Sequence, residues 1–226
     1  MEALILAAGQ GTRLRPLTNH KPKCLIEVKG ISILEYQLSA LKRAGVSNCI
    51  VVTGFQGDKI EEQFGSCFEG MAIDYVTNPQ FEDTNNLYSL WLGGSQLDDD
   101  VLLIESDILF DGLLLEDAMS NPHYDVAVVD TYRQGMDGTV IFAEKDIASS
   151  MVLKSRQSPG FDYQDALKTV NIYRFSRATF RLMLLPNLGD WVDRGFTDQF
   201  YERVIANSQT KKGLNTSGLR FIEYKK

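Results

Sequence analysis

A short apolar run that ends abruptly in glycine constrains the fold of this chain more than any other feature. Residues 3–8 are all apolar, which is typical of a strand buried on both faces in a parallel sheet. Gly9 and Gly11 follow directly, so the chain turns where the strand ends. Open α/β sheets bind their ligands at the carboxyl ends of the strands. We therefore expect a ligand-binding turn over residues 9–14.

Strands and helices alternate along the first half of the chain. Ser32 and Glu35 have capping-box spacing and Gly45 follows, which predicts a helix over residues 33–44. The other expected elements are strands over residues 49–54, 72–76 and 101–106, a helix that begins near Asp58, and a helix over residues 84–92. This order implies right-handed crossovers. The expected fold class is α/β, with a doubly wound, mostly parallel mixed sheet of the Rossmann-like kind.

Short alternating strands dominate the second half. We expect strands over residues 125–132, 139–144, 150–155, 168–175 and 219–223, and helices over residues 176–185 and 196–208. This pattern predicts a small antiparallel lobe added to the parallel sheet. Residues 1–226 would then form one domain with two halves, 1–111 and 112–226.

Charge and cysteine content exclude several classes of protein. The 23 basic residues against 30 acidic ones give a net charge of −7, which argues against binding to nucleic acid or to an anionic membrane surface. Cys24, Cys49 and Cys67 are odd in number and lack metal-ligand spacing, so we interpret them as small buried residues of a cytoplasmic protein. No apolar window reaches the roughly 18 residues of a membrane span, and the first residues lack the basic region of a signal peptide.

The turn over residues 9–14 has the composition of a phosphate-binding loop. Its glycines free backbone N–H groups to face an anion, and Arg13 supplies a fork of charged donors. Leu14 stands where a dinucleotide fingerprint has glycine, and the Gly-Lys-Ser/Thr of a Walker loop is missing. Lys21 and Lys23 flank a stiffening proline and add cations. The pattern favours nucleotide phosphates; the alternative is a solvated basic turn.

These residues resemble the signature of the nucleotidyltransferase superfamily, whose members join a nucleoside triphosphate to a phosphorylated acceptor. The resemblance lies in LAAGQGTRLRPLT followed by PKCL, over residues 6–25. It implies that the loop binds the base, ribose and phosphates, with Arg13 on the β and γ phosphates and Lys23 on the reacting α phosphate. The nucleotide-binding residues it implies are Leu6, Ala7, Ala8, Gly9, Gly11, Thr12, Arg13 and Lys23.

Asp107 follows the apolar segment VLLIES and is the first candidate metal ligand. A carboxylate at a buried sheet edge is costly without a cation, and Mg²⁺ takes one or two protein carboxylates with phosphate oxygens and water. The resemblance pairs Asp107 with an aspartate near a late helix, which we assign to Asp198. The alternative for Asp198 is an acid that stabilises a helix N-terminus beside Thr197. Many relatives have Asp where this chain has Glu105. We expect Mg²⁺ as the cofactor.

Three further segments resemble the small cytidylyltransferases, which activate phosphocholine or 2-aminoethylphosphonate. They are NNLYSLW (85–91), MDGTV (136–140) and KTVNIYRFS (168–176). The resemblance implies CTP and a small phosphorylated or phosphonate acceptor as partners. It assigns Asn86, Ser89 and Ser106 to the nucleotide, and Asp137, Lys168 and Trp191 to the acceptor. Lys168 would bind the acceptor's phosphate or phosphonate, because a cation on a rigid strand lowers the repulsion between two anions; the alternative is a surface lysine.

The acceptor's nitrogen could be met in two ways. A quaternary ammonium is met by aromatic faces, whereas a primary amine prefers carboxylates. The chain offers Trp191, Tyr132 and Tyr173 for an aromatic cage, and Asp137, Glu144 and Asp193 as carboxylates. The resemblance of residues 136–140 and 168–176 favours an aminoalkyl phosphonate.

The expected reaction is in-line attack of the acceptor's oxygen on the α-phosphorus of CTP, with release of pyrophosphate. Its catalytic residues would be Arg13, Lys23, Asp107 and Lys168. The alternatives are a sugar-1-phosphate nucleotidyltransferase and a non-catalytic nucleotide-sensing module. The sequence leaves open the choice of base and the oligomeric state, including a homodimer.

Relatives carry a Glu-Ile-Asp segment near the carboxyl end. Glu223 matches its glutamate, but nothing here matches its aspartate. Either the terminal element is absent, or the chain is one part of a longer fused protein.

Overall fold

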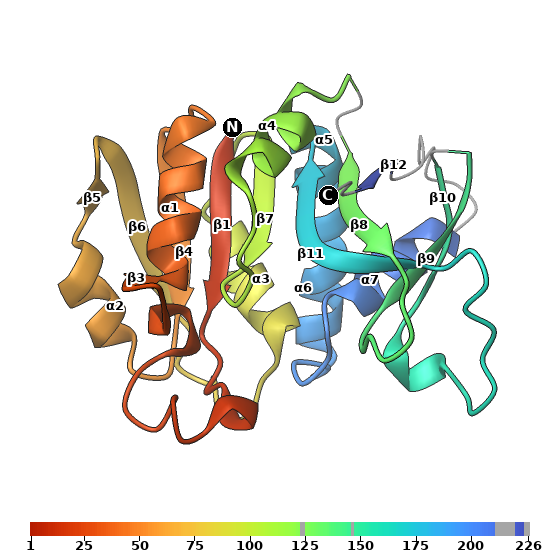
Figure 1. The fold of residues 1–226 in the computed structure, drawn as a ribbon, viewed down its shortest axis with the longest axis horizontal. Helices are drawn as coiled ribbons and strands as arrows, with labels where there is room; N and C mark the ends of the chain where they lie inside the picture. The colour runs from red at the N-terminus through yellow and green to blue at the C-terminus, as the bar shows by residue number, and fades with distance from the viewer. Residues whose placement is uncertain (123–124, 146, 211–219, 224–226) are drawn as a thin grey trace.

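A ten-stranded mixed sheet forms the centre of the molecule (Figure 1). This computed structural model describes residues 1–122, 125–145, 147–210 and 220–223. In these ranges the strand order is β5-β6-β4-β1-β7-β11-β8-β12-β10-β9. The strands are β1 (Glu2–Ala7), β4 (Asn48–Thr53), β5 (Cys67–Phe68), β6 (Met71–Thr77), β7 (Val101–Glu105), β8 (Val126–Thr131), β9 (Val140–Glu144), β10 (Ile147–Val152), β11 (Leu167–Phe175) and β12 (Arg220–Glu223). A separate hairpin pairs β2 (Glu27–Val28) with β3 (Ile31–Ser32).

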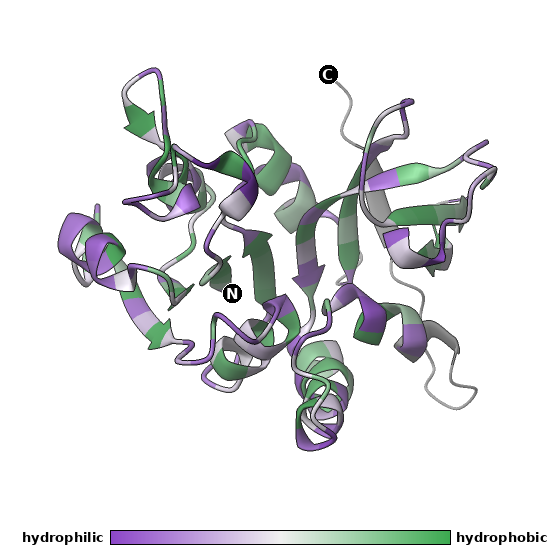
Figure 2. Ribbon diagram, turned by 90° about the horizontal axis from the view of Figure 1, so that it is seen from below, coloured by the Kyte–Doolittle hydropathy of each residue, from purple (hydrophilic) through white to green (hydrophobic). Residues whose placement is uncertain are grey.

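The parallel half of the sheet confirms the expected doubly wound arrangement. Strand β1 pairs in parallel with β4 on one side and β7 on the other, and β4 pairs in parallel with β6. Alternate residues of β1 belong to two hydrophobic cores, with Leu4 and Leu6 in one and Ile5 and Ala7 in the other. Figure 2 shows hydrophobic strand segments in the middle of the fold. The apolar run is therefore a strand buried on both faces.

Helices cover both faces of the sheet. They are α1 (Ile33–Arg43), α2 (Gly57–Phe64), α3 (Asn86–Gly94), α4 (Gly112–Ser120), α5 (Arg177–Thr179), the π-helical turn η4 (Phe180–Leu184), α6 (Leu185–Asp193) and α7 (Glu202–Thr210). Short 3₁₀ turns are η1 (Thr12–Leu14), η2 (Lys23–Leu25) and η3 (Lys154–Arg156). Helices α1 and α4 pack on one face, and α3, α6 and α7 pack on the other (Figure 1). Ser32 is confirmed as the N-cap of α1, because its Oγ accepts a hydrogen bond from the Glu35 N–H at 3.3 Å.

Strand β11 joins the parallel half to the antiparallel lobe. Residues 172–175 of β11 pair antiparallel with β7. Residues 167–169 and 173–174 of this strand pair antiparallel with β8. Its register breaks between Thr169 and Tyr173, and Asn171 in this break has a φ of 60°. Before the break, at Leu167 and Lys168, β11 bends away from β7 and pairs with β9 (Figure 1). The predicted antiparallel lobe is therefore an extension of the same sheet.

Several predicted boundaries were wrong. The helix expected over residues 176–185 continues to Asp193, because the π-helical turn before Pro186 accommodates a residue that cannot donate a backbone hydrogen bond. The helix expected over residues 196–208 begins only at Glu202. Helix α4 was not predicted, although Asp111 caps it by accepting from the Leu113 N–H. The strand expected over residues 150–155 ends at Val152; Leu219, the expected start of the last strand, lies outside the described residues.

Two cysteines are buried and one is not. Cys24 and Cys49 are buried free thiols, whereas Cys67 is exposed on the edge strand β5, so the prediction of burial was wrong for Cys67. None of the helices in the described ranges combines the length and the apolar character that a membrane crossing needs.

Candidate active site

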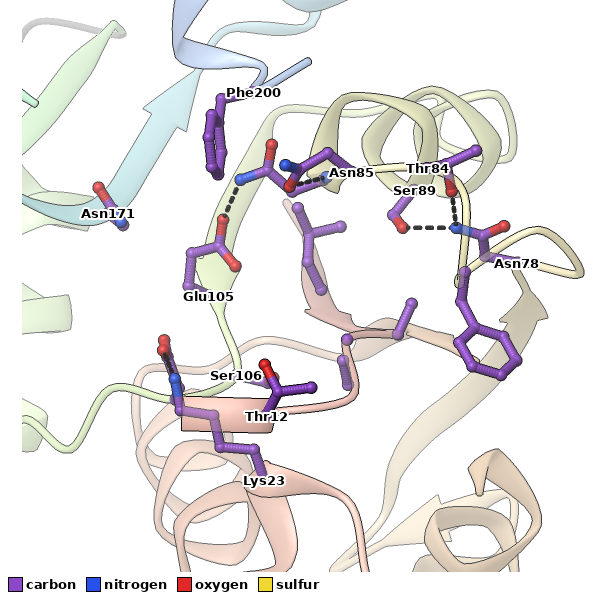
Figure 3. A pocket seen from close by; sticks show the side chains of 18 of the residues that line it. Thr12, Lys23, Asn78, Thr84, Asn85, Ser89, Glu105, Ser106, Asn171 and Phe200 are labelled. Atoms are coloured by element: carbon purple, nitrogen blue, oxygen red, sulfur yellow. Dashed lines mark hydrogen bonds and ion pairs between the residues drawn. The ribbon is translucent and has the colours of Figure 1, made fainter. Parts of the chain in front are cut away.

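A cavity of about 340 Å³ lies at the carboxyl end of β1 (Figure 3). Its walls come from the turn after β1, the start of α3, the end of β7, and β11 together with the segment leading into α7. The lining residues are Leu6, Ala7, Ala8, Gly9, Gly11, Thr12, Arg13, Leu14, Lys23, Asn78, Phe81, Thr84, Asn85, Asn86, Ser89, Glu105, Ser106, Asp107, Asn171, Phe200 and Glu202. Every residue that the sequence assigned to the nucleotide lines this cavity, and so does Asp107. Their placement together is a finding, and their individual roles stay predictions.

Gly11 gives the turn after β1 its shape. Its φ of 60° lies in the left-handed region, which glycine enters without strain. A Cβ at this position would lie 3.1 Å from Thr18 Cγ2 and 3.2 Å from Lys23 Cβ. Thr18 Oγ1 also donates a hydrogen bond to the Gly11 carbonyl at 2.8 Å. The glycine therefore allows the turn to pack directly against the segment that carries Lys23.

An ion pair joins Lys23 to Asp107 on the cavity lining. Lys23 lies in η2 and Asp107 follows β7, so the crossovers of the sheet bring together side chains that are 84 residues apart. Both side chains are partly exposed. The pair places a cation and a carboxylate beside the glycine turn, the combination that a triphosphate with a divalent cation requires.

Two further carboxyl groups, Glu105 and Glu202, line the same cavity. Glu105 accepts a hydrogen bond from Asn86 Nδ2 at 2.9 Å. Burial, together with the charges of Glu202 and Asp107, raises the pKa of Glu105 to about 8. Burial also raises the pKa of Glu202, while the charge of Lys168 opposes that shift. Sequence reasoning noted Glu105 only as a departure from relatives and missed Glu202.

The segment before α7 is held by the start of α3, which explains why Glu202 reaches the cavity. The Asn85 N–H donates to the Thr197 carbonyl at 2.9 Å, and the Tyr201 N–H donates to Asn86 Oδ1 at 3.0 Å. These bonds keep residues 196–201 out of a helix. Nothing local in the sequence indicates these long-range bonds, so sequence reasoning had no signal for Glu202.

Asp198 and Trp191 do not line the cavity. Asp198 is exposed, and its Oδ1 accepts a hydrogen bond from Gln199 Nε2 at 2.7 Å. The Trp191 ring packs 5.6 Å from the Phe196 ring and lies 5.4 Å from the Arg203 guanidinium carbon. The structure thus gives Trp191 a packing position on α6, and its assignment to the acceptor stays a prediction. The metal role of Asp198 stays a prediction.

The other acceptor candidates lie in the antiparallel lobe. Lys168 is half-buried on β11, and its Nζ donates to the Thr169 carbonyl at 2.8 Å. Burial lowers the pKa of Lys168, while the charges of Glu202 and Asp137 oppose that shift. Asp137 is exposed and lies 3.3 Å from Lys154 Nζ. Neither Lys168 nor Asp137 is part of the cavity lining.

An aromatic cage that includes Tyr173 is excluded by the packing. Tyr173 is fully buried in the core, where it stacks on Phe175. Tyr132 stacks on Tyr163 with ring centroids 4.1 Å apart. Glu144 and Asp193, the remaining carboxylate candidates, are exposed and lie outside the cavity lining.

The donor set fits Mg²⁺ only if the nucleotide supplies ligands as well. In the part of the chain that the structure describes, no three Asp, Glu, His or Cys side chains are grouped to hold a metal ion by themselves. Mg²⁺ is commonly held by one or two carboxylates while phosphate oxygens and water complete its octahedron. Asp107 could hold the ion in that way.

Comparison with known proteins gives one family and several relatives. Residues 3–160 match the model of the MobA-like NTP transferase domain. The CMP-5'-(3-aminopropyl)phosphonate synthase of Streptomyces rubellomurinus is 36% identical over 215 residues, which cover 94% of this chain and 34% of that protein. The choline-phosphate cytidylyltransferase of Streptococcus pneumoniae is 35% identical over 126 residues, covering 56% of this chain and 53% of that protein. The 2-aminoethylphosphonate cytidylyltransferase of Lancefieldella rimae is 37% identical over 109 residues, covering 47% of this chain and 43% of that protein.

The alignments span between about a third and a half of the length of these curated relatives. Among solved structures, the CTP:phosphocholine cytidylyltransferase of Streptococcus pneumoniae superposes with a TM-score of 0.77 at 23% identity, covering 100% of this chain and 90% of that one. At this identity the likeness establishes the fold alone.

Proposed function

Because the chain belongs to the MobA-like NTP transferase domain family, we propose that it transfers CMP from CTP to a small aminoalkyl phosphonate or phosphate, with release of pyrophosphate. One observation carries this proposal: the glycine turn, Lys23 and Asp107 line one cavity at the carboxyl end of β1. Three of the relatives, named for CMP transfer to 3-aminopropylphosphonate, choline phosphate and 2-aminoethylphosphonate, support the nucleotide and the acceptor class.

The reaction needs position and positive charge rather than a covalent nucleophile. The acceptor's oxygen attacks the α-phosphorus of CTP in line, a P–O bond forms, and the bond to pyrophosphate breaks. The backbone N–H groups of the glycine turn and the Arg13 guanidinium bind the β and γ phosphates. Lys23 offsets the charge that develops on the α phosphate, a contribution that is largest in a site prearranged for it. No general base is required, because the acceptor is already an anion at neutral pH.

Asp107 would hold Mg²⁺ together with phosphate oxygens, and Asp198 is our proposed second ligand. When bound, the ion offsets phosphate charge and orients the reacting groups. Lys168 would bind the acceptor's phosphonate or phosphate from the lobe side. Residues 1–111 supply most of the nucleotide site, and residues 112–226 supply the acceptor side.

The proposal is tested by an activity screen of four nucleoside triphosphates against phosphorylated and phosphonate acceptors, with coupled detection of pyrophosphate. We expect pyrophosphate release with CTP and 2-aminoethylphosphonate in the presence of Mg²⁺. Release with glucose 1-phosphate or mannose 1-phosphate, and with no aminoalkyl acceptor, would instead assign the chain to sugar activation. Tight nucleotide binding without release from any pair would favour a nucleotide-sensing module.

A further inference from the structure

The end of the cavity formed by β11 and the start of α7 contains acceptor atoms that have no donors. Glu202 is only 6% exposed, yet its Oε2 has no hydrogen-bond partner among the described residues. The same is true of Asn171 Oδ1. Both residues line the cavity. Buried polar atoms are nearly always paired, so two unpaired acceptors on one cavity wall indicate a ligand that donates.

Asn171 is held in its position by the break in β11. A φ of 60° is uncommon for a residue other than glycine, although asparagine tolerates it better than most. Strained backbone of this kind clusters at ligand sites. Figure 3 shows Asn171 on the same side of the cavity as Glu105 and Phe200, although the three come from β11, β7 and the segment before α7.

The chemistry of these groups selects the ligand. Glu202 and Glu105 are carboxyl groups on one wall of the cavity, and Asn171 offers a carbonyl oxygen. A cation beside two carboxyl groups favours their ionised forms, so a positively charged ligand with several N–H donors suits this site. A primary ammonium has three N–H donors, whereas a trimethylammonium has none. A quaternary ammonium would instead need a cage of aromatic faces. The rings of Tyr173 and Tyr201 are fully buried in the core, so Phe200 is the aromatic ring that the described residues offer on this wall, and a single ring does not form a cage.

We propose that Glu202, Asn171 and Glu105 bind the primary ammonium group of the acceptor, an inference that rests on the proposed function and names its substrate class. The acceptor is then an aminoalkyl phosphonate or phosphate with an unmethylated nitrogen. Asp137, which the sequence suggested for this role, is exposed and paired with Lys154. The ammonium end of the acceptor is therefore recognised by residues of α7, β11 and β7 rather than by the loop at residue 137.

The test compares three acceptors that differ only at the nitrogen: 2-aminoethylphosphonate, its N-trimethyl analogue and ethylphosphonate. For the unmodified chain we expect the lowest KM with 2-aminoethylphosphonate. Glu202→Gln should raise that KM at least about tenfold, as expected for loss of a hydrogen bond to a charged group, and should leave the KM values for ethylphosphonate and CTP unchanged. Asn171→Gly, in which glycine accepts the positive φ, should also raise the KM for 2-aminoethylphosphonate and leave the KM values for ethylphosphonate and CTP unchanged.

Glu116→Gln makes the same chemical change on the exposed face of α4 and should alter none of these constants. A preference for the trimethyl acceptor would overturn the inference. So would equal losses with 2-aminoethylphosphonate and ethylphosphonate in Glu202→Gln, or selective loss in Asp137→Asn instead.

Failure of the proposed function gives a different result, namely no pyrophosphate from CTP with any acceptor. In that case calorimetric titration with 2-aminoethylphosphonate and ethylphosphonate still decides the ammonium site. Tighter binding of the amine that disappears in Glu202→Gln supports the inference, and equal binding of the two compounds overturns it.

Discussion

Lys23 and Asp107 form an ion pair on the lining of the cavity, although one lies in a turn after β1 and the other follows β7. The two strands are neighbours in the sheet, so their carboxyl ends bring the two side chains together. Each partner holds the other in place beside the glycine turn. A ligand that brings both phosphate and a divalent cation can engage both groups.

We expect Lys23→Ala and Asp107→Ala each to lower kcat/KM for CTP by at least about 100-fold, the usual effect of removing one prearranged contact to the transition state. Pyrophosphate release with 2-aminoethylphosphonate measures this effect. Lys42→Ala, at the far end of α1, is the matched control and should change the rate less than about threefold. Wild-type rates in either cavity variant would show that the ion pair has no part in catalysis.

Magnesium dependence should report on the carboxylates individually. Chelation of divalent cations should abolish pyrophosphate release, and added Mg²⁺ should restore it. Asp107→Asn should raise the Mg²⁺ concentration for half-maximal rate at least about tenfold, because a neutral amide is a much weaker ligand than a carboxylate. The same titration of Asp198→Asn tests the second proposed ligand; an unchanged Mg²⁺ requirement would remove Asp198 from the site.

Replacement of Gly93 should reveal how closely α3 packs on the sheet. A Cβ at this position would lie 2.5 Å from Val52 Cγ2 and 2.7 Å from Leu4 Cδ1. Overpacking of this kind costs about 1–3 kcal/mol, so Gly93→Ala should lower the free energy of unfolding in urea by that amount. Gly112→Ala is the control, because its Cβ would meet only the flexible end of Arg43. Equal losses in the two variants would contradict this account of the packing.

The free energy of unfolding should fall as the pH rises, because of Glu202. Its pKa is raised in the folded state by burial, with Lys168 and Asn86 opposing and Glu105 nearby. The folded state therefore binds the proton more tightly than the unfolded chain, whose pKa is about 4.5. That contribution is fully present at low pH and is lost as the pH rises above about 4.5 toward the folded-state pKa. Glu202→Gln should become more stable relative to wild type over this rise, as measured by urea unfolding at several pH values. A difference that does not vary with pH would show that Glu202 is not a buried acid.

Thiol reactivity should separate the three cysteines. Burial raises the pKa of Cys24 to about 12 and raises that of Cys49 as well, whereas Cys67 is exposed. An aromatic disulfide reagent should therefore label one thiol quickly in the native protein and all three in urea. Cys67→Ser should eliminate the fast phase. Rapid labelling of two thiols in the native state would contradict the packing around η2 or β4.

The nucleotide side of this site could be predicted because its signals are local. An apolar run of six residues, two glycines and nearby cations specify a buried strand and a turn that faces an anion. The sheet topology then required Asp107 to lie beside that turn, since both follow neighbouring parallel strands.

The acceptor side could not be predicted in the same way. Glu202 reaches the cavity because residues 196–201 are held against α3 by hydrogen bonds with Asn85, which donates, and Asn86, which accepts. Such long-range bonds leave no local pattern in the sequence. Tyr173 had the composition of a cage residue, but the register of β11 directs its ring into the core. The helix expected to end at residue 185 continues past Pro186 through a π-helical turn.

The break in β11 separates two sets of strand pairings. On one side Phe175 and Tyr173 stay in register with β7, and on the other Lys168 follows the pairing of β9. Insertions or substitutions before Asn171, on the side of Lys168, can therefore reshape the lobe without shifting the strands that support the glycine turn. A joint of this kind would let a lineage diversify the molecules it activates while the way it handles the nucleotide stays constant.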